Sequence, residues 1–103
     1  MKAEQYSIIK TTCKNKKEAK ILAEILINAK LVACAQISKI ESLYLWEGEI
    51  HNANEYQLSL KTKSNNYKTI EKLILENHSY KIPQIIEIPI VEGSDDFLKW
   101  LAS

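Results

Sequence analysis

Hydrophobic and polar residues recur along this chain with two different periods, which separate predicted strands from predicted helices. Residues 6–12 are short, β-branched and aromatic, as is typical of a strand. In residues 15–30, alanines and leucines recur three and four positions apart, which predicts a helix. Asn15 is in the N-cap position of that helix, and Glu18 stands three residues later, as in a capping box. The first two predicted elements are therefore a strand and a helix.

A second strand is expected over residues 31–46. Because this segment is long for one strand, we expect a bend or bulge near residues 38–42. Gly48 and the polar residues 49–54 indicate a hairpin turn. Residues 55–63 then alternate, so that one face of a third strand should enter the core, through Tyr56, Leu58, Leu60 and Thr62.

The last third of the chain repeats the order of helix and strand. A helix is expected over residues 64–78, capped by Ser64 or Asn65. Residues 84–92 form the fourth predicted strand, and Pro89 within it favours an edge position or a bulge. A short helix over residues 95–102, capped by Ser94, completes the prediction.

The order βαββαβ, followed by a short C-terminal helix, predicts the fold class. It indicates an α+β, ferredoxin-like sandwich with an antiparallel sheet, in a single domain over residues 1–103. Two helices can cover only one face of that sheet, so the other face is expected to be open. An uncovered patch at Tyr44 and Trp46 would be a liability on a monomer, and self-association is the simplest cover.

Charge and composition narrow the choice of partners. The net charge is +1 and all 14 basic residues are lysines. Because arginine does most bidentate recognition of phosphate and bases, we expect no nucleic-acid partner and no acylphosphatase-like enzyme. No apolar run is long enough for a membrane span, and neither a secretory signal nor a disulfide framework is evident. We therefore expect a cytoplasmic protein with no membrane partner.

Three residues carry candidate chemistry. Cys13 lacks the second cysteine of a C-x-x-C site and is interpreted as a thiol without a role. Cys34, between two alanines, is either a small buried residue or a thiolate that Lys61 stabilises. His78 either ligates a metal or caps the C-terminus of the second helix. No arrangement of catalytic residues can be found from the spacing.

Several blocks of the sequence together resemble the CutA family of divalent-cation tolerance proteins. These blocks occur in the order LVACAQI, SLYLWEGEI, LSLKTK, NHSYKIPQIIEIPI and FLKWL, and the resemblance extends from Tyr6 to Leu101. It implies a homotrimer with inward-facing sheets and a role in tolerance of copper and other divalent metals. It implies no established catalytic reaction.

The resemblance also implies a cleft between subunits, formed by Cys34, Tyr44, Trp46, Glu47, Lys61, His78 and Tyr80. We expect Lys61 to pair there with a carboxylate, either Glu47 or Glu55.

Thr11 and Asn77 stand at positions where some family members have copper ligands. His78 therefore remains as the expected metal ligand. We expect weak Cu²⁺ binding and no other cofactor.

The alternative function is a trimeric small-molecule sensor resembling PII-type signalling proteins. Those proteins have a long loop between the middle strands, which residues 48–55 are too short to provide.

Overall fold

The sequence of helices and strands follows the predicted order. A computed structural model of the chain describes residues 5–103. Its elements are β1 (Tyr6–Cys13), α1 (Lys16–Asn28), β2 (Cys34–Trp46), β3 (Glu49–Lys63), a 3₁₀ turn (Ser64–Asn66), α2 (Tyr67–Asn77), β4 (Ile85–Ile90) and α3 (Asp95–Ala102). The βαββαβ order with a C-terminal helix is thereby confirmed.

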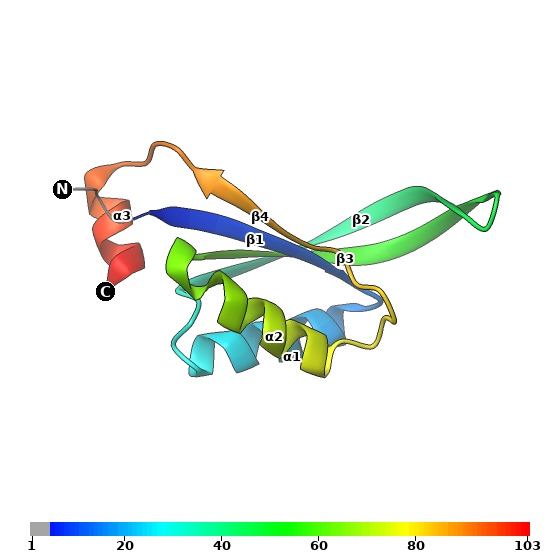
Figure 1. Ribbon diagram of the computed structural model, residues 1–103, viewed down its shortest axis with the longest axis horizontal. Helices are drawn as coiled ribbons and strands as arrows, with labels where there is room; N and C mark the ends of the chain where they lie inside the picture. The colour runs from blue at the N-terminus through cyan, green and yellow to red at the C-terminus, as the bar shows by residue number, and fades with distance from the viewer. Residues whose placement is uncertain (1–4) are drawn as a thin grey trace.

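The four strands form one antiparallel sheet in the order β2-β3-β1-β4. Helices α1 and α2 lie together on one face of it, while α3 lies at the end of the sheet where β1 begins (Figure 1). Strand β4 is an edge, as Pro89 predicted, and an edge strand tolerates a residue that cannot donate to a neighbour. The ferredoxin-like arrangement therefore has one helix-covered face.

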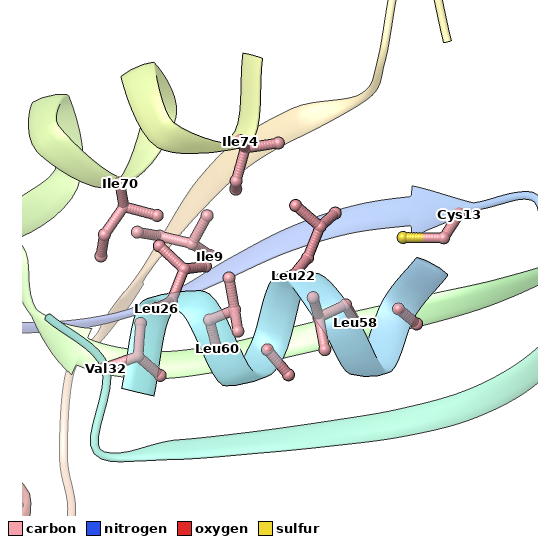
Figure 2. Close-up of a cluster of buried hydrophobic side chains, with 11 residues drawn as sticks. Ile9, Cys13, Leu22, Leu26, Val32, Leu58, Leu60, Ile70 and Ile74 are labelled. Carbon is pink, nitrogen blue, oxygen red and sulfur yellow. The ribbon is translucent and has the colours of Figure 1, made fainter. Parts of the chain in front are cut away.

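The core lies between the sheet and the two helices (Figure 2). Ile9 from β1 and Leu58 and Leu60 from β3 are fully buried, as the alternation of residues 55–63 predicted for β3. Burying a side chain of this size stabilises the fold by about 1.5–3 kcal/mol. The helices contribute the residues that cover these strands, namely Ala19, Leu22, Ala23, Leu26, Ile70 and Ile74.

The helix starts differ in how well the sequence predicted them. Asn15 caps α1, because its Oδ1 accepts the Glu18 amide at 2.8 Å. The expected cap of α2 by Ser64 or Asn65 is wrong. Those residues belong to the 3₁₀ turn, and Asn66 Nδ2 donates instead to the Leu31 carbonyl at 3.1 Å. The polar residues before α2 thus hold the loop that leads into β2.

Strands β2 and β3 form a long hairpin that projects beyond the helices (Figure 1). Their register is unbroken from Cys34↔Lys61 to Trp46↔Glu49, so the bulge expected in β2 is absent. The turn consists of Glu47 and Gly48 alone, both with positive φ, and the polar residues 49–54 continue β3. A two-residue turn of this kind matches the twist of paired strands, which lets the ladder run to the tip.

The face of the sheet opposite α1 and α2 is largely uncovered in the protomer. The register places Tyr44 and Trp46 of β2 on this face, together with Ile86 and Ile88 of β4, and all four are exposed. The open face predicted from the element order is therefore present. In residues 5–103, none of the helices combines the length and the apolar character needed to span a bilayer.

Candidate functional site

Three side chains with metal-binding atoms meet where β1 ends. Their ligand atoms, from Cys13, Glu18 and His78, all lie within 4.8 Å of one another. Cys13 is the last residue of β1, Glu18 is in the first turn of α1, and His78 follows α2. The packing of the helices on the sheet brings these three positions together. The structure therefore places a thiol and a carboxylate beside the histidine that was predicted as a metal ligand.

The Cys13 thiol lies at the end of the buried cluster and has no exposed surface (Figure 2). Burial raises its pKa to about 12, with further contributions from the negative charges of Glu18 and Glu55. A thiol with such a pKa is neutral at pH 7. A metal ion that takes this sulfur as a thiolate must therefore displace a proton.

Glu18 reaches from α1 to the segment that follows α2. Its Oε1 accepts the Lys14 amide at 3.2 Å, and its Oε2 accepts the Ser79 amide at 3.0 Å. Burial by itself would raise the pKa of this carboxyl, but the hydrogen bonds from Ser79 and Lys14, with His78 nearby, lower it overall. Glu18 is thus an anion held between the two other members of the cluster.

His78 already uses both ring nitrogens. Its Nδ1 accepts the Tyr80 amide at 3.0 Å, so Nε2 carries the proton that is donated to the Thr12 carbonyl at 2.8 Å. A metal ion must displace one of these partners. The ligands of a tetrahedral ion with bonds near 2.0–2.3 Å lie roughly 3.5 Å apart, so the cluster must also contract. The arrangement is suited to weak binding of a cation that prefers nitrogen and sulfur.

A second feature lies on the open face, where the half of the hairpin nearer its turn meets the segment between α2 and β4. A groove of about 650 Å³ is formed there, and it is lined by Thr12, Ser42, Leu43, Tyr44, Trp46, Ala53, Glu55, Tyr80, Lys81, Ile82 and Gln84. The Tyr80 hydroxyl donates to Glu55 Oε2 at 2.7 Å. Burial, followed by this hydrogen bond and the charge of Glu55, raises the pKa of Tyr80, which therefore remains a donor at neutral pH.

Apart from His78, which belongs to the cluster with Cys13 and Glu18, the residues of the predicted cleft fall into two groups in the protomer. Tyr44, Trp46 and Tyr80 line the groove, and Glu47 is exposed in the adjoining turn. Cys34 and Lys61 are cross-strand partners at the opposite end of the hairpin. Ten strand positions separate Cys34 from Tyr44, which corresponds to roughly 33 Å.

Lys61 also does not meet its expected carboxylate within one protomer. Its Nζ lies 5.7 Å from the centre of the Phe97 ring, and within residues 5–103 it forms no ion pair with Glu47 or Glu55. The pairing of Lys61 with Glu47 or Glu55 stays a prediction for an assembly of several copies. The same holds for the prediction that all the cleft residues meet in one place.

Sequence reasoning missed Cys13 and Glu18 as site residues. The element order held a signal for both, because the end of β1 and the start of α1 lie at the same end of the sandwich as the end of α2. The period of the strand held a second signal, for Cys13. Cys13 stands two residues after Thr11, so both point to the same face of β1. Glu55 was expected only as a partner of Lys61, and its hydrogen bond with Tyr80 had no local signal, because the two residues lie 25 positions apart.

Comparison with known proteins identifies relatives along almost the whole chain. A family model described as CutA1 divalent ion tolerance protein matches residues 7–103. The chloroplastic CutA protein of Arabidopsis thaliana is 36% identical over 95 residues, which are 91% of this chain and 52% of that protein. The divalent-cation tolerance protein CutA of Archaeoglobus fulgidus is 35% identical over 96 residues, 93% of this chain and 94% of that protein.

Solved structures agree with the sequence matches. The structure of the periplasmic divalent cation tolerance protein CutA from Archaeoglobus fulgidus superposes with a TM-score of 0.91 at 35% identity, and the match covers 93% of this chain and 94% of that one. The chain spans about half the length of the plant relative. These relatives are named as CutA or as tolerance proteins rather than as enzymes. The comparisons lend no support to the PII-type alternative, and the two-residue turn between β2 and β3 leaves no long loop there.

Proposed function

Because this chain belongs to the CutA1 family of divalent ion tolerance proteins, we propose that it serves divalent-cation tolerance as a binding module for Cu²⁺. The observation that carries the proposal is the cluster of Cys13, Glu18 and His78, whose ligand atoms lie within 4.8 Å of one another. Sites with nitrogen and sulfur ligands favour Cu²⁺ among the common divalent ions. Affinity is modest, because Cu²⁺ must displace a thiol proton and a hydrogen bond of His78.

The proposal includes a homotrimer. Its support is the open face of the sheet, where Tyr44, Trp46, Ile86 and Ile88 are exposed on the protomer. Large exposed apolar patches usually mark interaction sites, and permanent interfaces typically bury about 2,000 Å² or more. A trimer would allow the Cys34–Lys61 end of one protomer to approach the hairpin tip of its neighbour. We also place the protein in the cytoplasm, consistent with its two free cysteines.

The metal proposal is tested by calorimetry on the intact chain. Cu²⁺ should bind more tightly than Zn²⁺, and Ca²⁺ should bind weakest because the cluster offers it a single carboxylate. His78→Ala should weaken Cu²⁺ binding about tenfold or more. His51→Ala is the matched control, since His51 is the other histidine of the chain and is exposed on the hairpin. Equal Cu²⁺ affinity of the His78→Ala variant and the parent protein would remove the cluster as the binding site.

A further inference from the structure

The imidazole of His78 is held between two backbone groups, which fix the position of its proton. Its Nδ1 accepts the Tyr80 amide at 3.0 Å, and its Nε2 donates to the Thr12 carbonyl at 2.8 Å. Metal-bound histidines usually donate their other ring N–H to a carbonyl or a carboxylate, which fixes the tautomer. The bond to Thr12 is already of this kind. His78 is therefore arranged to offer Nδ1, and the Tyr80 amide occupies the lone pair that a metal ion needs.

Ligation through the other ring nitrogen would disrupt more of this arrangement. A neutral imidazole that binds a metal through Nε2 carries its proton on Nδ1, where that proton would face the N–H group of Tyr80. The ring would then lose both of its backbone hydrogen bonds, whereas ligation through Nδ1 loses only the bond with Tyr80. Each lost bond leaves a part-buried backbone group without its partner, which lowers the affinity for the metal.

We propose that the metal of this cluster binds His78 through Nδ1, and that the backbone at Tyr80 must withdraw to admit it. The proposal rests on the metal-binding function proposed for Cys13, Glu18 and His78. A Zn–N bond is about 2.0 Å long, so an ion on the line of the 3.0 Å hydrogen bond would lie only about 1 Å from the Tyr80 nitrogen. The two cannot coexist, and binding therefore displaces the segment that follows His78.

Tyr80 is held by its side chain as well as by its amide. Its hydroxyl donates to Glu55 Oε2 at 2.7 Å, and Glu55 belongs to β3, so this bond anchors the segment to the sheet. Hydrogen bonds to a carboxylate are among the stronger ones in proteins. Withdrawal of the Tyr80 backbone works against this anchor. Tyr80 is therefore a positioning residue that opposes metal entry, although it lies outside the ligand set.

Nuclear magnetic resonance of the ¹⁵N-labelled protein tests which nitrogen binds. Zn²⁺ is the probe, because an ion with a filled d shell does not broaden the resonances. The Nδ1 resonance of His78 should shift as Zn²⁺ binds, while Nε2 keeps its proton. Hydrogen exchange at the Tyr80 amide should become at least tenfold faster. The Leu31 amide, which donates to the Leu26 carbonyl, is the control and should keep its exchange rate.

A substitution at Tyr80 tests its opposing role. Tyr80→Phe keeps the ring but removes the bond to Glu55, so calorimetry should show Zn²⁺ and Cu²⁺ affinities about fivefold or more above those of the parent protein. Tyr67→Phe is the matched control, because the Tyr67 hydroxyl donates to Glu71 at the same distance of 2.7 Å within α2. Its affinities should stay within about twofold of the parent. A purely structural role for Tyr80 would lower the affinity or leave it unchanged.

Two results would overturn the proposal while leaving the cluster as the metal site. One is a Zn²⁺-induced shift that places the metal on Nε2 of His78, with the Tyr80 amide still protected. The other is an affinity of a folded Tyr80→Phe variant equal to or below that of the parent protein. Should that variant fail to fold, the ring-nitrogen shifts of the parent decide the question. If neither ring nitrogen of His78 responds to Zn²⁺ or Cu²⁺, the metal does not bind at the cluster, which overturns the proposed function as well.

Discussion

The proton that Cys13 carries should govern how Cu²⁺ affinity depends on pH. The pKa of this thiol is raised to about 12, so between pH 6 and 8 nearly every molecule holds the proton. Binding of Cu²⁺ to the thiolate must release it. Metal and proton therefore compete, and affinity rises with pH throughout this window.

The magnitude follows from the number of protons released. One proton changes the affinity tenfold per pH unit, or about 1.4 kcal/mol, which amounts to roughly 100-fold between pH 6 and 8. Glu18 adds nothing to this slope, because its lowered pKa keeps the carboxylate ionised across the window. In Cys13→Ser the hydroxyl does not ionise, so the slope should fall by one proton relative to the parent.

The measurement is competition calorimetry with Cu²⁺ at several pH values. Co²⁺ provides a second probe that does not oxidise thiols, and a thiolate charge-transfer band should develop in the parent protein and not in Cys13→Ser. Cys34→Ser is the matched control, since Cys34 lies at the far end of the hairpin and should keep the full slope. Identical slopes for Cys13→Ser and the parent would refute thiolate ligation. Circular dichroism shows that each variant is folded.

Other predictions concern stability and assembly. Leu58→Ala should lower the free energy of unfolding by about 2–5 kcal/mol in urea titrations, because Leu58 is fully buried, whereas Leu45→Ala, at a position 71% exposed, should change it little. Asn15→Ala removes the cap of α1 and should cost about 1 kcal/mol in the same assay. Trp46→Asp should reduce the mass measured by light scattering at low micromolar protein more than Trp100→Phe does; a monomeric mass for the parent protein would contradict the trimer.

Elements with local signals can be predicted from the amino-acid pattern of short segments. The cap at Asn15 depends on Glu18, three residues away, and the helix that follows needs only its own periodicity. The alternation around Leu58 and Leu60 likewise predicts which face of β3 is buried. The order of these elements predicts an antiparallel sandwich with one open face, because the handedness of the crossovers and the number of helices leave few alternative folds.

The long-range arrangement depends on packing between distant parts of the chain. The hairpin turn is an example, because Glu47 lacks the usual local preference for positive φ, and pairing along the whole ladder holds it there. Cys13 and His78 are 65 positions apart, and they meet because α1 and α2 pack on the same face of the sheet. Glu55 and Tyr80 are 25 positions apart, and their hydrogen bond forms where the segment after α2 meets β3. Distances of this kind are set by packing, which no short stretch of sequence encodes.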